Sequence, residues 1–455
     1  MLRERVPLDG ANTHRPYGKV RNDRRYDRSV PVYSADWVLP VDGAPIAEGS
    51  VAVEDGRIAA LGPRREIGPG ERFDGAAILP GFVNAHSHLE YAVYAGFGDG
   101  LPFDEWLALH VQRKARIGVD EMSAIARLGA AECLRSGTTT VGDASYSAAA
   151  ASACSELGLR AIVYVEVFGA GTDHIRERFE AQRDRVASSL SELVQIGVSP
   201  HTPYTASLEL WQAALALGVP AMTHFAETEL EVEWTRTGRG PVSGVTPTSI
   251  RELAEHGLLV DRLVAAHCVH VDPEEIALLS EHDVAVAHCP RSNALLGCGI
   301  APLRPLLDAG LRVGLGTDSP ASAPSFDMFD ELRACLMSAR LRERGPAAIS
   351  ARDALELATL GSARALGLDE ETGSLAAGKR ADLTVVSLRG SPYLPWEDPA
   401  GAVVLGGSPS RVLLTVVDGT ERYRKGSTEW PELTAEAHGA RSRLLASAPA
   451  AERAP

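Results

Sequence analysis

The chain has 455 residues, and its 60 acidic side chains outnumber its 45 Lys and Arg residues, which gives a formal net charge of −15 at pH 7. Such an acidic composition disfavours nucleic acids and anionic membranes as partners. Hydrophobic residues make up 45% of the sequence, as is ordinary for a globular protein, and no run of about 18 apolar residues predicts a membrane span.

The N-terminal segment, residues 1 to about 30, is polar and rich in arginine. No apolar stretch follows Arg24-Arg25, so the segment lacks the core of a secretory or twin-arginine signal. We expect a disordered tail or a start site placed too early. The six cysteines show no paired metal-knuckle spacing and do not form the pattern of a disulfide framework, which favours a reducing, cytoplasmic location.

Short apolar segments near both ends of the remaining chain have the pattern of β-strands. Asp55-Gly56 and Asp418-Gly419 are strong signals for tight turns between them. We expect strands at residues 30–33, 50–53, 57–61, 381–386, 403–405 and 412–417. We therefore predict one small β-sandwich domain built from both termini, residues 31–80 plus 369–430, and a C-terminal tail or helix over residues 431–455.

The middle of the chain, residues 81–368, alternates apolar runs with segments of helical spacing such as residues 123–134 and 207–217. Eight such units in fewer than 300 residues predict an α/β fold, a (β/α)8 TIM-like barrel. A doubly wound open sheet would give a similar pattern, but no glycine fingerprint for a dinucleotide follows the first strand. The barrel strands are expected at residues 78–84, 139–141, 160–165, 196–200, 221–223, 263–266, 284–287 and 312–315.

Two histidines, His86 and His88, come at the carboxyl end of the first barrel strand. Residues i and i+2 of a strand share a face, so both imidazoles point the same way, at the end where barrel enzymes place their chemistry. Imidazole suits zinc or iron(II), although an HxH pair alone is a weak signal.

Further residues of the metal-ligand type follow other apolar strands. His224 and then Glu227 follow the fifth strand, His267 follows the sixth and Asp318 follows the eighth. Any one of them could be a polar loop residue, but because the carboxyl ends of barrel strands meet at one face, their coincidence predicts a shared site.

Together with Pro80-Gly-Phe-Val-Asn-Ala-His-Ser-His88 and residues 373–382, these strand ends resemble the amidohydrolase superfamily and its nucleoside and base deaminase group. The resemblance covers nearly everything after residue 30. It implies His86, His88, His224 and Asp318 as metal ligands, with Glu227, His267 and Asp318 as catalytic residues.

The resemblance also bears on the metal. Dinuclear relatives use a carboxylated lysine near the end of the fourth strand, and residues 196–204 contain no lysine. We therefore predict one divalent ion per chain, zinc or iron(II), because three histidines and an aspartate suit both. Such an ion lowers the pKa of its bound water toward about 7, Glu227 could protonate a ring nitrogen, and His267 could stabilise the developing oxyanion. The resemblance also allows a homodimer.

Candidate substrate-binding residues carry weaker signals, and each has a structural alternative. Glu90 could bind ribose hydroxyls or cap a helix, and His201, at a position that contacts substrate in similar deaminases, could instead be a packed histidine. Trp106 could cover a base or belong to the core. Arg291 and Ser292 could reach a carboxylate or phosphate, or form a structural turn.

Residues 226–241 and the stretches around His267 and residues 287–293 resemble the aminodeoxyfutalosine deaminases of menaquinone biosynthesis. The resemblance implies a small nucleoside or base as substrate and loss of ammonia from an adenine-type ring. Deaminases of adenosine, S-adenosylhomocysteine, methylthioadenosine or guanine, and triazine-type chlorohydrolases, are alternatives. A non-catalytic barrel or binding protein is an alternative of another class, which the intact ligand set disfavours.

Overall fold

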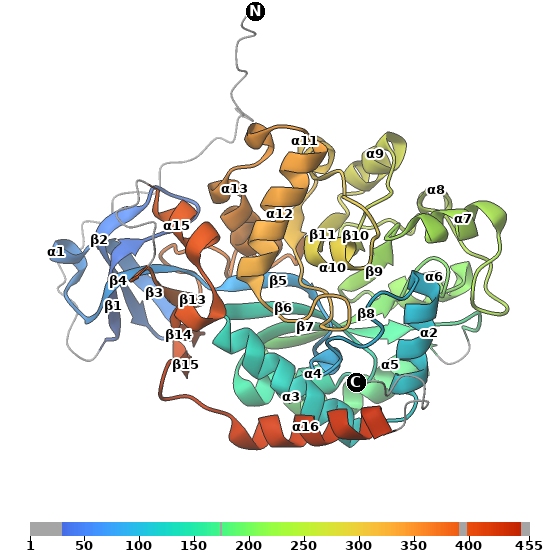
Figure 1. Ribbon diagram of the computed structural model, residues 1–455, viewed down its shortest axis with the longest axis horizontal. Helices are drawn as coiled ribbons and strands as arrows, with labels where there is room; N and C mark the ends of the chain where they lie inside the picture. The colour runs from blue at the N-terminus through green and yellow to red at the C-terminus, as the bar shows by residue number, and fades with distance from the viewer. Residues whose placement is uncertain (1–29, 173–174, 391–397, 447–455) are drawn as a thin grey trace, which may run out of the picture.

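The computed structural model describes residues 30–172, 175–390 and 398–446, and the tail expected at residues 1–30 lies almost wholly outside these ranges. Eight parallel strands form a barrel that helices surround, and a separate mixed sheet lies at one side of it (Figure 1). The predicted α/β barrel fold is therefore confirmed. None of the described helices is both long enough and apolar enough to cross a membrane.

The barrel strands pair in chain order, each parallel to the next. They are β5 (Phe82–Ser87), β6 (Thr138–Ser145), β7 (Arg160–Val167), β8 (Val194–Pro200), β9 (Ala221–Phe225), β10 (Leu263–His267), β11 (Ala285–His288) and β12 (Val313–Leu315).

The small sheet contains strands from both ends of the chain, in the order β15-β14-β13-β4-β1-β2-β3. A bridge between Arg57 and Arg380 brings the start of β3 back to the segment before β13, so the sheet bends over its own apolar core. The strands are β1 (Val32–Val38), β2 (Ile46–Glu54), β3 (Arg57–Pro63), β4 (Glu71–Pro80), β13 (Leu383–Ser387), β14 (Val412–Val417) and β15 (Thr420–Arg424).

Helices cover the barrel, and the last of them, α16, packs along α3 (Figure 1). The described helices are α1 (Arg64–Ile67), α2 (Phe103–Lys114), α3 (Val119–Arg135), α4 (Ala149–Leu157), α5 (Ile175–Arg185), α6 (Leu208–Leu215), α7 (Glu229–Thr237), α8 (Ile250–Glu255), α9 (Pro273–Glu281), α10 (Pro290–Leu295), α11 (Leu303–Asp308), α12 (Met328–Arg342), α13 (Ala351–Glu356), α14 (Ser362–Ala365), α15 (Pro399–Gly406) and α16 (Pro431–Ala446).

Two strand predictions need correction. The strand expected at residues 78–84 is two strands, β4 of the small sheet and β5 of the barrel, which separate at Gly81. A Cβ on Gly81 would lie 2.1 Å from the side chain of Thr139, so glycine permits this close crossing. The strand expected at residues 403–405 lies in α15, because Asp398 caps the helix and Pro399 occupies its first turn.

The barrel closes between β5 and the residues after β12. Asp318 N–H donates to the His86 carbonyl at 3.0 Å, and Ser87 forms a parallel bridge with Asp318. A Cβ on Gly316 would lie 2.7 Å from that of His86, so only glycine allows this approach. The closure therefore brings together residues from the first and last strands of the barrel.

A buried ion pair joins the barrel to the small sheet. Arg160, at the start of β7, donates to both carboxylate oxygens of Asp382 at 2.7 and 3.2 Å, and Asp418 N–H donates to the same carboxylate at 2.7 Å. The buried Asp382 carboxylate thus accepts hydrogen bonds from both the barrel and the small sheet, and a buried charge requires such partners.

Candidate metal and catalytic site

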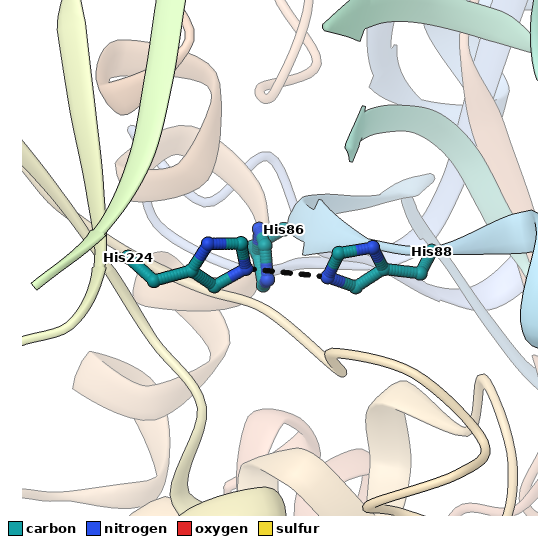
Figure 2. A group of neighbouring side chains, drawn as sticks. All are labelled: His86, His88 and His224. Atoms are coloured by element: carbon teal, nitrogen blue, oxygen red, sulfur yellow. Dashed lines mark hydrogen bonds between the residues drawn. The ribbon is translucent and has the colours of Figure 1, made fainter. Parts of the chain in front are cut away.

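Three imidazoles and one carboxylate converge at the carboxyl ends of the barrel strands. His86 lies on β5, His88 directly after it, and His224 on β9, and Figure 2 shows their rings pointing toward one another. The Nε2 atoms of His88 and His224 are 3.3 Å apart, and Asp318 Oδ1 lies 3.4 Å from His88 Nε2 and 3.5 Å from His86 Nε2. His86, His88 and His224 therefore form one group that could hold a metal ion, and Asp318 forms a second, overlapping group with His86 and His267.

The protonation pattern of these rings suits a cation. His224 Nδ1–H donates to the His201 carbonyl at 2.8 Å, so its Nε2, 3.3 Å from His88 Nε2, is the ring nitrogen that faces the cluster. His86 Nε2 is buried, and none of the described residues is hydrogen-bonded to it. Burial lowers the pKa of His86 to about 3 and that of His88 to about 4, so both rings are neutral at pH 7. A metal ion is a group that these converging ring nitrogens could hold.

Asp318 is held so that one oxygen faces the histidines. Its Oδ2 accepts hydrogen bonds from Ser292 Oγ at 2.6 Å and Ser322 Oγ at 2.7 Å, which leaves Oδ1 directed at the cluster. Burial alone would raise the pKa of Asp318, but the neighbouring histidines, His86 first among them, outweigh it and hold that pKa well below its usual range. The carboxylate is therefore charged and oriented.

Glu227 and His267 lie beside this cluster. Burial, reinforced by Asp318, raises the pKa of Glu227 to about 8, so its carboxyl group carries a proton at pH 7 in the metal-free protein. The Glu227 N–H donates to Glu231 Oε2 at 3.2 Å. His267 Nδ1–H donates to Asn293 Oδ1 at 2.9 Å, which leaves its Nε2 free. His267 and Asp318 have φ values of 71° and 56°, an uncommon conformation that often marks functional sites.

A cavity of about 420 Å³ opens in front of the cluster. His88, His224, Glu227, His267 and Asp318 all border it. Two of the predicted substrate residues, Trp106 and His201, border it as well. The other side chains in its wall are Tyr91, Phe103, Leu107, His110, Val111, Lys114, Ala115, Tyr146, Glu166, Phe168, Arg178, Thr202, Tyr204 and Ser319.

The other three predicted substrate residues do not border the cavity. Glu90 accepts hydrogen bonds from Ser145 Oγ and Ser147 Oγ, each at 2.6 Å, and from the backbone N–H groups at positions 146, 147 and 149. It therefore ties down the start of α4. Ser292 supports Asp318, as described above.

Arg291, like Glu90 and Ser292, forms its contacts within the protein. Its guanidinium pairs with buried Glu331 and donates to the Ser325 carbonyl at 2.7 Å. The bonds of Arg291 therefore hold the chain after β11 against α12, rather than reaching a ligand.

Two charged residues of the cavity wall, Lys114 and Glu166, were not singled out from the sequence. Glu166 lies near the end of β7, and its oxygens are 3.8 Å from Lys114 Nζ, 3.9 Å from His88 Nδ1 and 3.8 Å from His201 Nε2. Burial would raise the pKa of Glu166, but Lys114 and the histidines lower it to about 2. A glutamate within the apolar run of residues 162–167 was the available signal.

The sequence pattern of the Amidohydrolase family matches residues 77–422. The chain belongs to this family. It is 36% identical over 402 residues to a 5′-deoxyadenosine deaminase of Methanothermobacter thermautotrophicus, an overlap that covers 86% of this chain and 92% of the relative. A 5-methylthioadenosine/S-adenosylhomocysteine deaminase of Moorella thermoacetica is 34% identical over 414 residues, covering 86% and 94%. These relatives place this amidohydrolase in the nucleoside deaminase group.

Solved structures agree with the fold. A zinc-bound adenosine deaminase from Xanthomonas campestris superposes with a TM-score of 0.83 at 29% identity, covering 91% of this amidohydrolase and 98% of that chain. The zinc-containing atrazine chlorohydrolase TrzN from Arthrobacter aurescens superposes with a TM-score of 0.80 at 25% identity, covering 90% and 99%. Both of these structures contain zinc, and the histidine cluster of this amidohydrolase is a group of side chains that could hold a metal ion.

Proposed function

We propose that this amidohydrolase is a metal-dependent hydrolytic deaminase that replaces the 6-amino group of an adenine nucleoside with oxygen and releases ammonia. The observation that carries the proposal is the buried carboxyl of Glu227, which borders the cavity beside the histidine cluster and Asp318 and whose pKa is raised to about 8 by burial. An acid next to a metal site is what protonation of a purine nitrogen during water attack requires. The nucleoside deaminases among its relatives support the same chemistry.

We further propose one zinc or iron(II) ion per chain, held by His86, His88, His224 and Asp318. The buried, unpartnered Nε2 of His86 and the facing Nε2 atoms of His88 and His224 fit such an ion. When bound, it would lower the pKa of a water molecule enough to supply a nucleophile at neutral pH.

The remaining steps fall to side chains around this site. Glu227 would give its proton to a ring nitrogen of the purine, which makes the adjacent carbon more electrophilic. Asp318 would accept a proton lost by the attacking water, and His267, when its Nε2 carries a proton, would stabilise the negative charge that develops on the water oxygen. One of the two protons of the water would restore the proton that Glu227 gave to the ring nitrogen, and the other would pass from Asp318 to the amine, which leaves as ammonia, so water and nucleoside are consumed in equal amounts.

The cavity favours a substrate larger than adenosine itself. Its wall is largely aromatic, with Phe103 and Trp106 from α2, Tyr146 and Phe168, and it includes the guanidinium of Arg178. We propose a 5′-substituted adenosine, in line with the compounds named for the relatives. The aromatic wall and Arg178 would suit a substituent that ends in an aromatic carboxylate, so the proposal includes aminodeoxyfutalosine and, with it, menaquinone biosynthesis.

The test is ammonia release from the zinc- and iron-loaded protein, assayed with adenosine, 5′-deoxyadenosine, methylthioadenosine, S-adenosylhomocysteine, aminodeoxyfutalosine and guanine. We expect the highest kcat/KM with a 5′-substituted adenosine. A chlorinated triazine belongs in the same assay, because halide release without ammonia release would overturn the deaminase proposal in favour of a chlorohydrolase. A metal-loaded protein inactive toward every compound would favour a non-catalytic barrel.

A further inference from the structure

The Glu166 carboxylate is buried, with 2% of the residue exposed, yet it borders the cavity. Within the described part of the chain, no hydrogen bond of 3.5 Å or less reaches either of its oxygens, and its nearest partners lie at 3.8 and 3.9 Å. Buried carboxylates normally accept several hydrogen bonds, so this one has acceptor capacity left for a ligand.

The charge of Glu166 is fixed by its surroundings. The Lys114 ammonium, from the end of α2, lies 3.8 Å from Glu166 Oε2. Lys114 Nζ is itself 4.5 Å from the ring centre of Tyr91 and 4.7 Å from that of Tyr146, so it is held over the cavity wall by two aromatic faces. A carboxylate in this setting is ionised, and an ionised carboxylate can only accept hydrogen bonds.

The chemistry of an adenine nucleoside then limits what Glu166 can bind. The ring nitrogens of neutral adenine that are free of the sugar are acceptors and would be repelled by a carboxylate. The 6-amino group is the base's only N–H donor, and the proposed reaction places it at Glu227 and the metal ligands. The remaining donors of a nucleoside are the hydroxyl groups of its sugar.

We propose that Glu166, paired with Lys114, accepts hydrogen bonds from the 2′- and 3′-hydroxyls of the ribose and so selects ribonucleosides over free bases and over sugars that lack these two hydroxyls. This inference rests on the proposed deaminase function and adds a substrate-binding residue to it. The proposal gives Glu166 the role that the sequence suggested for Glu90. Glu90 already accepts hydrogen bonds from five donor groups of Ser145, Tyr146, Ser147 and Ala149.

The experiment compares adenosine with 2′,3′-dideoxyadenosine, which keeps the base and the 5′-hydroxyl. In the zinc-loaded wild type we expect kcat/KM to favour adenosine by about 10- to 100-fold, the factor for a hydrogen bond to a charged group. In Glu166→Gln that preference should fall to within about threefold. The product pair inosine and 2′,3′-dideoxyinosine, titrated by calorimetry, should lose its difference in Kd in parallel.

Two further variants test whether a change in the preference for adenosine comes from Glu166 itself. Glu166→Gln leaves the Lys114 ammonium buried without its partner, so the double variant Lys114→Met/Glu166→Gln, which removes both charges, covers the case in which the single variant does not fold. Glu90→Gln is the matched control, because it changes an equally buried carboxylate that lies outside the cavity. It should lower Tm and leave the preference for adenosine unchanged.

The outcomes separate the possibilities. If the folded Glu166 variants lose activity equally on both nucleosides, Glu166 does not form hydrogen bonds with the hydroxyls, and the inference is overturned. If zinc affinity, measured against a chelator, falls while the preference persists, Glu166 instead orients His88 through its Nδ1–H. If the wild type releases ammonia from no compound of the substrate panel but still binds inosine more tightly than its dideoxy form, the deaminase proposal fails and the hydroxyl contact stands. Absence of both activity and binding overturns both.

Discussion

The orientation of Asp318 can be perturbed without touching any metal ligand. Ser292 Oγ and Ser322 Oγ donate to Asp318 Oδ2 at 2.6 and 2.7 Å, while Oδ1 faces His86 and His88. Replacing either serine by alanine removes one of the two bonds that fix the carboxylate plane. The carboxylate can then rotate, and its Oδ1 is less often in the position that the histidines require.

The expected loss follows from these contacts. A hydrogen bond to a charged group contributes about 1.5–3 kcal/mol, and about 1.4 kcal/mol corresponds to a tenfold change in affinity. Each single change should therefore weaken metal binding by about 10- to 100-fold, which is the range found for groups that orient metal ligands. Because the two serines act on the same oxygen, the double variant should lose less than the product of the single losses.

The assay is a zinc titration of the chelator-stripped protein against a chromophoric competitor, followed by kcat/KM at saturating zinc. Ser325→Ala is the matched control, because Ser325 Oγ accepts from Arg291 at 3.1 Å and makes no contact with Asp318. We expect Ser292→Ala and Ser322→Ala to bind zinc more weakly and Ser325→Ala to match the wild type. Wild-type zinc affinity in the double variant would refute the assignment of Asp318 Oδ1 as an oriented ligand.

Three further predictions follow from the site. Burial and Asp318 raise the pKa of Glu227 to about 8, and a bound cation would lower it. We therefore expect kcat/KM to fall as the pH rises, with a midpoint at or below about pH 8. A midpoint above pH 9 would contradict this. A carboxyl group whose pKa is raised by folding destabilises the protein as the pH rises from its pKa in the unfolded chain, about 4.3, to its pKa in the folded chain. Glu227→Gln should therefore raise the Tm of the metal-free protein at pH 8 and not at pH 4. Equal Tm values for the variant and the wild type at pH 8 would argue against a buried acid. Chelation should abolish ammonia release and one equivalent of zinc or iron(II) per chain should restore it, whereas a requirement for two would exclude the single-ion site.

The barrel and its ring of strand-end side chains could be predicted because both follow from local pattern. Apolar runs predicted the parallel strands, and parallel strands bring their carboxyl ends to one face. His86, His224, His267 and Asp318 each follow such a run closely, so their meeting needed no knowledge of loop structure.

A local sequence pattern does not predict the structure where contacts with another helix or strand determine it. The apolar run at residues 403–405 resembles a strand, but Asp398 and Pro399 begin a helix there that packs against α12 and α13. Lys114 reaches the cavity only because α2 lies beside the carboxyl end of the barrel. The helical spacing of residues 103–114 gives no information on that placement.

The two buried glutamates show what decides between a structural and a ligand-binding role. Glu90 and Glu166 are both nearly inaccessible and both lie close to the ends of barrel strands, so their sequence settings favour neither role. In the folded chain, hydroxyls and backbone N–H groups after β6 satisfy Glu90, whereas Glu166 faces a cation and two imidazoles at distances too long for hydrogen bonds. A buried carboxylate whose acceptor capacity the protein leaves unused is the one that can bind substrate. The number of donors around each carboxylate is a property of the assembled barrel, which is why Glu166 emerged only from the structure.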